Sequence, residues 1–533
     1  MRNVNTLLVL KADAVVEPLV GRWHAWPHLV APATAALNIA HKHLALLESF
    51  VSAPDVHAAA CKNPSLRGGP FVDLPPEQVE AVKQLIQDTK INRAAQIQFG
   101  MDLREAQRTI MKLGDGFSLE HHYQSLSDSV RGYLELTYSP MGFANVKVLE
   151  SLLYRRGRHY PEFQTAMLYL AKGDERPFAF STPRLRTAQA LEITQPFHSS
   201  VYDYLAKLRT CGSPFEEIVQ TLGVNESKKD LLKSFLCEPS ATRLEHAAAP
   251  KKTRWRYFGH ACVLVETAAG INVLVDPIIA YEADLLLPRF TLADLPEKID
   301  YVVFTHTHAD HVVIETLLAI RYKVDTVVVP ANGGQMADPS LKLLLESIGF
   351  EKVISLNALE SETLADLTLT ALPFLGEHGN LDIQSKAAWL VQSGNDKLLF
   401  AADSNNLEPR IYQFIHDAFG DIDSLFIGME CLGAPFSWTY GPLLPMAIDR
   451  KKDQSRRLDG SDFERGMKVV EALGCKNVYV YAMGAEPWIQ YVTSIDPSED
   501  TAPAINAKQL IEKCQSIGLN AVRLYGSAQV VLA

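Results

Sequence analysis

Three histidines and one aspartate stand within six residues of this sequence, as His306, His308, Asp310 and His311. The apolar run 301–304 directly before them predicts a buried strand that ends at this motif. Side chains two residues apart at a strand end point to the same side, so His306 and His308 can share one metal ion. Asp310 and His311 lie on the following turn and can face a second metal ion nearby. A polar turn alone would not need so many ligand groups, and the sequence therefore predicts a metal site that suits zinc, iron or manganese.

The residues around this motif predict a layered α/β domain. A hairpin is indicated by the apolar runs 262–266 and 271–276, which a short Ala-Gly turn joins. Alternation of strands and helices is typical of sheets whose outer faces are covered by helices. Helical patterns lie between some of the further predicted strands, which are 301–304, 326–329, 367–372, 388–392 and 397–401.

The part of the chain before the motif reads as an α-rich mixed domain. Two prolines and a glutamate at 75–77 open a stretch with helical periodicity, and 199–236 predicts helices separated by a turn. Two short apolar runs, 132–138 and 177–180, predict strands. We find no internal repeat and no chemistry that the residues of this part reveal.

The pattern changes from helical to strand-rich near 247–252. At 533 residues the chain is too long for one ordinary core. We therefore expect an N-terminal domain at 1–246, which would serve dimerisation or partner contacts, and a catalytic domain at 253–533.

The bulk composition excludes several functional classes. A formal net charge of −11 repels phosphate backbones, so we expect no nucleic acid as partner. The seven cysteines are scattered without a paired C-x-x-C spacing, which is typical of reduced thiols in a cytoplasm. No apolar run reaches the length of a membrane span, about eighteen residues. We expect a cytoplasmic protein that does not enter a membrane.

The histidine motif is one part of a longer resemblance. Its H-x-H-x-D-H spacing, with the Gly-His-Ala triplet 259–261 and the strand end 274–277 before it, resembles the metallo-β-lactamase superfamily. The resemblance implies an αββα sandwich in which a later aspartate bridges two metal ions. Asp403, which follows the apolar run 398–402, is the residue at that place. A carboxylate has two oxygens and can span two cations, whereas an imidazole normally binds one.

Two departures from the superfamily pattern narrow this resemblance. A third histidine would complete the first metal site, but the chain has Glu377 and His378 at this place. A last histidine would complete the second site, but none follows the apolar run 478–481. We favour Glu377 as the ligand and His378 as its hydrogen-bonding neighbour, and the sequence leaves the reverse assignment open. The implied ligand set is rich in oxygen, which favours harder ions than zinc, and comprises His306, His308, Asp310, His311, Glu377 and Asp403.

These departures, the long segment before the motif, and the stretches 429–435 and 453–458 resemble the diiron β-hydroxylases of nonribosomal peptide biosynthesis, of the chloramphenicol-pathway type. The resemblance implies a non-heme diiron monooxygenase with two iron ions, O2 as co-substrate and an external electron donor. The substrate would be an amino acid held as a thioester on the carrier (thiolation) domain of a nonribosomal peptide synthetase. Glu377 would change its mode of coordination and Asp403 would bridge the ions, so both are expected to be catalytic. The sequence leaves open whether the substrate side chain is aromatic or aliphatic.

A dinuclear zinc or manganese hydrolase of the same fold is the main alternative, with a metal-bridging hydroxide as nucleophile. Glu377 and the missing last histidine argue against it. A scaffold that only binds partners is a third interpretation, against which the costly cluster of polar groups argues. We expect His260 to pack beside the metal loop, and we leave Glu430 and Glu486 outside the ligand set.

A basic cluster stands out in this acidic sequence and comprises Arg450, Lys451, Lys452, Arg456 and Arg457. A carrier protein presents a phosphopantetheine arm with a phosphate, so a positive patch near the mouth of the pocket would help docking. We expect the lysines to be solvated. The guanidinium groups of Arg456 and Arg457 are expected to bind phosphate or buried carboxylates. We further expect a homodimer.

Overall fold

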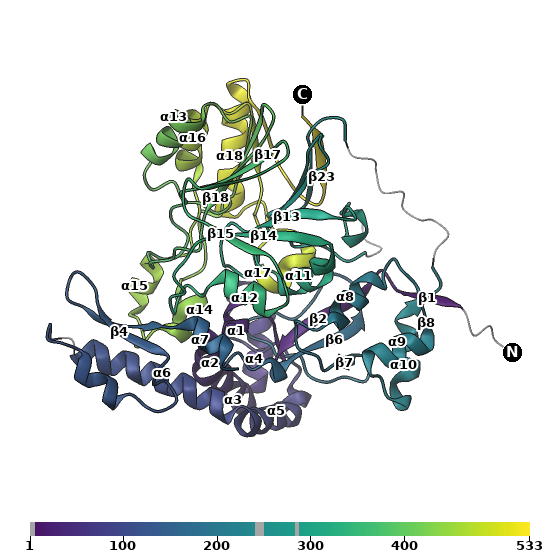
Figure 1. The fold of residues 1–533 in the computed structure, drawn as a ribbon, viewed down its shortest axis with the longest axis vertical. Helices are drawn as coiled ribbons and strands as arrows, with labels where there is room; N and C mark the ends of the chain where they lie inside the picture. Colours follow the sequence, from purple (N-terminus) through teal and green to yellow (C-terminus); the bar gives the residue numbers. More distant parts are fainter. Residues whose placement is uncertain (1–5, 114, 240–249, 283–286, 533) are drawn as a thin grey trace.

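The structure is a computed structural model that describes residues 6–113, 115–239, 250–282 and 287–532. Of the stretch 247–252, where the sequence pattern changes, residues 247–249 lie outside the described part. From residue 254 onward the chain forms two seven-stranded sheets. Figure 1 shows them in the upper half of the molecule, with the N-terminal part below.

Each of the two sheets combines antiparallel hairpins with a parallel half. In spatial order the first sheet contains β15 (Val353–Leu356), β14 (Val324–Pro330), β13 (Ile299–Val303), β12 (Asn272–Val275), β11 (Cys262–Glu266), β10 (Arg254–Gly259) and β23 (Ala528–Val531). The second contains β16 (Ser361–Leu364), β17 (Leu367–Leu372), β18 (Ala388–Ser393), β19 (Asp396–Phe400), β20 (Ser424–Ile427), β21 (Asn477–Val480) and β22 (Asn520–Arg523).

The sheets pack face to face, because alternate residues of each strand point to opposite sides. In β13, Val303 joins the core between the sheets, whereas Val302 joins the core on the outer face. Strands buried on both faces read as continuous apolar runs, which explains the run 301–304. The predicted αββα sandwich is therefore confirmed.

Helices cover both outer faces of the sandwich. Those on the first sheet are α11 (Ile314–Ile320) and α12 (Leu341–Ser347), and those on the second are α13 (Arg410–Phe419), α16 (Phe463–Leu473) and α18 (Ala502–Ser516). Three shorter helices lie on connecting loops, namely α14 (Ser437–Tyr440), α15 (Arg450–Ser455) and α17 (Gln490–Thr493).

The N-terminal part contains ten α-helices within the residues that the structure describes, together with short strands. The helices are α1 (Pro27–Val30), α2 (Pro32–Asn38), α3 (Leu44–Ser52), α4 (Pro54–Cys61), α5 (Val79–Asn92), α6 (Ala94–Leu113), α7 (Glu150–Arg155), α8 (Ser200–Lys207), α9 (Phe215–Leu222) and α10 (Lys229–Ser234). The strands are β1 (Leu7–Leu10), β2 (Ala14–Val20), β3 (Trp23–His24), β4 (Leu134–Tyr138), β5 (Ala144–Val148), β6 (Gln164–Leu170), β7 (Leu191–Ile193), β8 (Ser213–Pro214) and β9 (Leu236–Cys237). The predicted α-rich mixed character is confirmed.

A π-helical turn, η1 (Ile39–His43), joins α2 to α3 without a break. Such turns hold one residue more than an α turn and are frequent at functional sites. Ile39 and His43 are buried, and the His43 ring stacks on Trp23 with 3.8 Å between ring centroids. His41 and Lys42, between them, remain partly exposed.

The N-terminal part is joined to the sandwich by a shared core and by buried charges. One cluster of buried apolar side chains contains residues of both parts, among them Leu10 and Trp488. Within it, the Glu17 carboxylate accepts from Arg184 Nε (2.8 Å), and Arg176 donates two hydrogen bonds to Glu315 on α11 (3.0 and 2.7 Å). Two guanidinium groups thus balance two carboxylates, and this network needs no metal ion.

The strand prediction at 177–180 is wrong, because this segment forms an irregular turn. Its backbone groups find other partners: the Arg184 guanidinium donates to the Pro177 carbonyl (2.8 Å), and the Ala179 N–H donates to the Tyr491 carbonyl (2.8 Å). The other strands and helices named above lie where the sequence places them, within two residues at most of their ends.

No helix in the described ranges is long and apolar enough to cross a membrane. All seven cysteines lie in these ranges as free thiols, as expected. The cytoplasmic location stays a prediction.

Candidate metal centre

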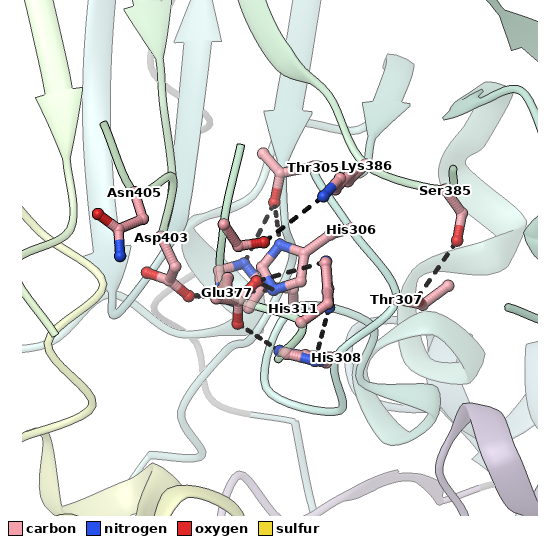
Figure 2. A network of polar contacts seen from close by, with 12 residues as sticks. Thr305, His306, Thr307, His308, His311, Glu377, Ser385, Lys386, Asp403 and Asn405 are labelled. Carbon is pink, nitrogen blue, oxygen red and sulfur yellow. Dashed lines mark hydrogen bonds and ion pairs between the residues drawn. The ribbon is translucent and has the colours of Figure 1, made fainter. Parts of the chain in front are cut away.

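The residues of the predicted metal site lie on loops that follow strand ends. Asp276 follows β12, the histidine motif follows β13, and Asp403 follows β19. Glu377 lies on the loop between β17 and β18. These loops meet at one edge of the sandwich, and Figure 2 shows the imidazole rings gathered around Glu377 and Asp403.

One group of donor atoms consists of His306, His308 and Glu377. The carboxylate lies between the two rings: its Oε2 is 3.1 Å from His306 Nε2, and its Oε1 contacts His308 Nδ1. All three side chains are buried, and one donor atom of each lies within 4.8 Å of the others. His378 Nδ1 is 3.2 Å from His308 Nε2 and 3.1 Å from the Tyr440 hydroxyl, and its Nε2 is 3.6 Å from Glu377 Oε2. None of the groups of three donor atoms in the described ranges includes His378. The geometry thus favours Glu377 over His378 in this group.

Two further groups of donor atoms adjoin the first: one shares His306 with it, and the other shares His311 with that second group. His306, His311 and Asp403 form one, in which His311 Nε2 is 2.9 Å and His306 Nε2 is 3.9 Å from Asp403 Oδ2. His260, Asp310 and His311 form the other, in which His260 Nε2 is 3.2 Å from Asp310 Oδ2. The structure therefore brings all six predicted ligands together and places His260 beside Asp310.

Thr305 fixes which nitrogen of His306 carries the proton. Its hydroxyl donates to Asp276 Oδ2 (2.5 Å), so its oxygen is left to accept from His306 Nδ1 (3.0 Å). The remaining nitrogen, Nε2, then presents a lone pair to the Glu377 carboxylate. Burial lowers the pKa of His306, an effect that Glu377 only partly offsets, so the ring stays neutral. A lone pair facing a carboxylate at 3.1 Å is repulsive unless a cation lies between them.

His311 is arranged in the same way. Its Nδ1 lies 2.8 Å from Asp276 Oδ2, which leaves Nε2 facing Asp403. Burial lowers the pKa of His311, but the carboxylates of Asp403, Asp276 and Asp310 outweigh it and hold the pKa well above its ordinary value. Without a metal ion a proton therefore occupies Nε2, and a metal ion would displace it.

The charge of the cluster also calls for cations. Four buried or half-buried carboxylates surround the histidines, and within the described ranges no lysine or arginine forms an ion pair with any of them. Lys386 lies nearby but donates to the Gly376 carbonyl (3.5 Å). The carboxylates are Asp276, Asp310, Glu377 and Asp403. Two divalent cations would supply four positive charges, and His306 Nε2, Glu377 Oε2 and Asp403 Oδ1 are buried without hydrogen-bond partners. The residues present fit a pair of metal ions.

The backbone around the donors is strained and closely packed. Glu377 has a backbone φ of 65°, a value that residues other than glycine rarely adopt. Such outliers cluster at functional sites. A Cβ on Gly376 would lie 2.3 Å from the Cβ of Asn405. A Cβ on Gly428 would lie 2.5 Å from Asp403 Oδ1, so this glycine makes the space that the Asp403 carboxylate needs.

His260 lies beside the backbone that follows β21, where the superfamily pattern places its last histidine. The Gly484 N–H donates to His260 Nδ1 (3.1 Å), and the Ala482 N–H donates to its carbonyl (2.9 Å). Because Nδ1 accepts a hydrogen bond, the proton of the neutral ring lies on Nε2, which faces Asp310. His260 thus contacts Asp310 with N–H and does not offer it a lone pair. The Gly-His-Ala triplet was the signal for this role.

The two glutamates left outside the ligand set differ in their surroundings: Glu486 is a buried hydrogen-bond acceptor, and Glu430 faces the metal centre. Glu486 accepts hydrogen bonds from the Tyr257 hydroxyl (2.5 Å) and the His260 N–H (3.1 Å). Glu430 lines the cavity described next, and burial together with the charges of Asp403 and Asp310 raises its pKa to about 8.

A cavity of about 1310 Å³ opens from the donor groups. Both parts of the chain line it, so the N-terminal part contributes directly to the site. Its wall includes the donors His308, Asp310, Glu377 and Asp403, the apolar rings Trp26, Phe178, Phe180 and Trp438, and the basic residues Lys42, Arg67, Arg104, Arg108, Arg450 and Arg457.

The expectation for Arg456 is not supported by its contacts. Its Nε donates to the Gly379 carbonyl (2.7 Å), and its guanidinium lies over the Phe436 ring at 4.3 Å from the centroid. Both contacts hold the loop that carries Glu377. Arg457 lines the cavity and donates to Gln454 Oε1 (2.7 Å).

Comparisons with known proteins cover almost the full length of this chain, and they point to the same family. A family model described as the diiron non-heme β-hydroxylase N-terminal domain matches residues 9–239, and one described as a β-lactamase superfamily domain matches residues 271–434. The 4-amino-L-phenylalanyl-[CmlP-peptidyl-carrier-protein] 3-hydroxylase of Streptomyces venezuelae is 34% identical over 97% of this chain and 98% of its own length. The crystal structure of CmlA, a diiron β-hydroxylase from Streptomyces venezuelae, superposes with a TM-score of 0.91 and 33% identity over 99% of this chain and 100% of that one.

A glutamate-to-aspartate variant of CmlA superposes equally well, with a TM-score of 0.90 and 33% identity over 98% of this chain and 100% of that one. The family decides between the three interpretations of the sequence, against the hydrolase and against the scaffold, and confirms the enzyme as a non-heme diiron monooxygenase. With a relative this similar over almost its whole length, the chain belongs to the diiron non-heme β-hydroxylase family.

Proposed function

We propose that this protein uses O2 to hydroxylate the β-carbon of an amino acid held as a thioester on the carrier domain of a nonribosomal peptide synthetase. The observation that carries the proposal is a metal-donor cluster that opens into a cavity of about 1310 Å³. Pockets for small ligands measure about 300–1,000 Å³, so this cavity exceeds what a free amino acid requires. The relative named for action on an aminoacyl group of a peptidyl carrier protein supports a tethered substrate.

We assign the six predicted ligands to two iron ions. His306, His308 and Glu377 would hold one ion, because a lone pair of His306 faces the Glu377 carboxylate. Asp310 and His311 would hold the other. Asp403 would lie between the ions, since its Oδ2 approaches His311 and, more distantly, His306.

Hydroxylation places one oxygen atom in the C–H bond and releases the other as water, which consumes two electrons and two protons. The irons, when bound, supply the activation of O2, which no side chain can perform, and an external donor supplies the electrons. The chain itself contributes position and polarity. Asp276 and Thr305 hold the Nδ1 protons of His306 and His311, which keeps the Nε2 atoms of these two rings available. Phe178 and Phe180 give the cavity an apolar wall, against which the reacting carbon would be shielded from water.

The proposal is tested by metal content and product analysis. Protein purified with iron available is expected to hold two irons per chain and, with a reductant and 18O2, to add one labelled oxygen to an aminoacyl carrier protein. The mass of the cleaved amino acid gives the readout. Two tightly held zinc ions together with hydrolysis of the thioester and no incorporation of label would overturn the proposal.

The choice between Glu377 and His378 has its own test. Glu377→His is expected to retain metal and to lose most of its hydroxylation, because an imidazole cannot change between one and two bonds to a metal as a carboxylate can. His378→Ala is expected to retain iron. If Glu377→His hydroxylates normally while His378→Ala loses iron, the ligand is the other neighbour.

We further propose a homodimer that forms through the N-terminal part. Near the β4–β5 hairpin, Phe117, Met141 and Phe143 are 74%, 80% and 71% exposed, and the Tyr138 hydroxyl donates to the Phe117 carbonyl (2.9 Å), which ties these segments together. Exposed apolar groups gathered on one tip are typical of an interaction surface. Met141→Ser with Phe143→Ser is expected to yield monomers in sedimentation experiments, and a wild type that already sediments as a monomer would refute the proposal.

A further inference from the structure

The cavity wall carries basic residues that have no acidic partners. Lys42 on η1, Arg67, Arg104 and Arg108 on α6, and Arg450 on α15 line it. None of these five forms an ion pair within the ranges that the structure describes. This concentration of free positive charge is unusual in a chain with a net charge of −11. We refer to Lys42, Arg104 and Arg108 as the basic wall.

The basic wall is held in place by backbone carbonyls. Arg104 and Arg108 lie one helical turn apart, and their guanidinium groups donate to the carbonyls of Pro442 and Pro445, the latter at 2.6 Å. Lys42 Nζ donates to the Trp438 carbonyl (3.3 Å). These contacts use only part of the donor capacity of each side chain. Further N–H groups of these side chains are therefore available to a ligand.

Helix α6 reaches this position because it packs unusually close to α2. A Cβ on Gly100 would lie 2.3 Å from the Ala36 carbonyl oxygen, so only glycine permits the approach. In the same region His41 Nε2 lies 3.2 Å from the Gly100 carbonyl. Figure 1 shows α14 and α15 above α6, and the contact between Arg104 and Pro442 joins α6 to the connection between these two short helices.

The positive charges of the basic wall are not neutralised by ion pairs within the described ranges. Burial, and then the charge of Arg108, lowers the pKa of Arg104 to about 10. Burial also lowers the pKa of Lys42 to about 8, and that of His41 falls through burial and the charge of Arg104. Cations crowded together in this way favour an anion among them, and no carboxylate of the described residues forms an ion pair with them.

Exposure increases along the cavity from the metal centre to the basic residues. Glu377 and Asp403 are each 6% exposed, Lys42 and Arg104 are half-buried, and Arg108 and Arg450 are exposed. Lys42 and Arg104 therefore lie nearer the buried donors, and Arg108 and Arg450 lie nearer the mouth. A thin chain can reach Lys42 and Arg104 inside the cavity, whereas the surface of a folded partner cannot.

We infer that the basic wall binds the phosphodiester of the phosphopantetheine arm and so places the thioester-bound amino acid at the metal centre. The inference rests on the proposed function, because it takes the substrate to arrive on a carrier arm. It gives the N-terminal part a role in the site: α6 and η1 bind the phosphodiester of the arm, and the sandwich carries the metal ligands. Charge-assisted contacts from guanidinium groups to a phosphate oxygen suit this role.

The test compares two small probes on iron-loaded protein: 4′-phosphopantetheine and pantetheine, which lacks the phosphate. Wild type is expected to bind the first more tightly, and the difference should shrink as salt is raised. Arg104→Gln with Arg108→Gln is expected to bind 4′-phosphopantetheine about tenfold more weakly, with pantetheine binding and iron content unchanged. The matched control is Lys83→Gln with Lys112→Gln, which removes the same charge from α5 and α6 outside the cavity and is expected to behave as wild type.

The outcomes separate this inference from the proposed function. If wild type binds the two probes equally, or the double variant keeps the preference for phosphate, the inference is wrong. If the variant binds both probes normally and yet has a raised KM for an aminoacyl carrier, the arginines contact the carrier protein itself, which also overturns the inference. If wild type prefers the phosphate but hydroxylates no carrier-bound amino acid, the proposed function fails and the binding site stands.

Discussion

Replacing Thr305 by valine would remove one hydroxyl that controls the protons of the metal centre. The side chain is buried, donates to Asp276 Oδ2 at 2.5 Å and lies 3.0 Å from His306 Nδ1. Valine keeps the branched shape, and the Thr305 N–H still donates to Asp276 Oδ1 (2.7 Å). The substitution therefore isolates the hydroxyl. His306 would lose the partner that holds its proton on Nδ1, and Nε2 would no longer be reserved for a metal ion.

The expected size follows from these two contacts. One hydrogen bond to a neutral group and one to a carboxylate contribute about 1 and about 2 kcal/mol, so metal-free Thr305→Val should lose about 3 kcal/mol of unfolding free energy. Partners that orient a ligand typically account for about 10–100-fold in metal affinity.

Denaturant unfolding of the metal-free protein and titration with ferrous iron under anaerobic conditions measure the two effects. Thr305→Ser keeps the hydroxyl and is expected to lose only the methyl contribution, about 0.8 kcal/mol. A valine variant with wild-type affinity, or a serine variant that is equally impaired, would refute the reasoning.

Three further predictions follow from contacts at and around the centre. The raised pKa of His311 stabilises the metal-free protein below the unfolded pKa of about 6.5, and this contribution is lost as pH rises through the folded pKa. The midpoint temperature of thermal unfolding of the metal-free protein should therefore fall as the pH rises above about 6.5, less so in His311→Gln, while iron binding should tighten and release a proton. Gly428→Ala should displace Asp403 and weaken iron binding about 10–100-fold, whereas Gly333→Ala, whose added Cβ meets nothing within 4 Å, should not; equal iron content in both would contradict this. Glu17→Gln should cost about 3–5 kcal/mol of unfolding free energy, because it leaves Arg184 without a buried carboxylate and leaves Arg176 with Glu315 alone, with iron content unchanged; a loss under 1 kcal/mol would show that the network is dispensable.

The catalytic half of the fold could be predicted from the sequence because its signals are local. Strands buried on both faces give apolar runs, and the motif follows one of them directly. The run 177–180 misled for the same reason: its phenylalanines are apolar because they line a cavity, which no local pattern distinguishes from a sheet. Proline at 177 was the one local sign against a ladder.

The site could be predicted only where its residues share a motif or a known pattern. His306, His308, Asp310 and His311 are adjacent in sequence, and Glu377 and Asp403 were found through the resemblance. Asp276 contacts His311 and Thr305 from the end of another strand, and Thr305 in turn orients the adjacent His306. The basic wall is formed by α6 and η1, where one helix brings two arginines to a cavity completed more than 300 residues later. Such contacts depend on tertiary packing and leave no periodic signal.

A π turn amounts to a one-residue insertion in the helix that runs from α2 through η1 to α3. The insertion sets the rotational phase of everything after it, since each residue turns a helix by about 100°. Without it, the buried Leu47 and Phe50 of α3 would leave the core at the same time as Lys42 left the cavity. A change in this π turn would therefore alter the packing of the core and the position of Lys42 together. In an alignment, a relative with a one-residue gap between Asn38 and Leu44 is expected to have lost both arrangements.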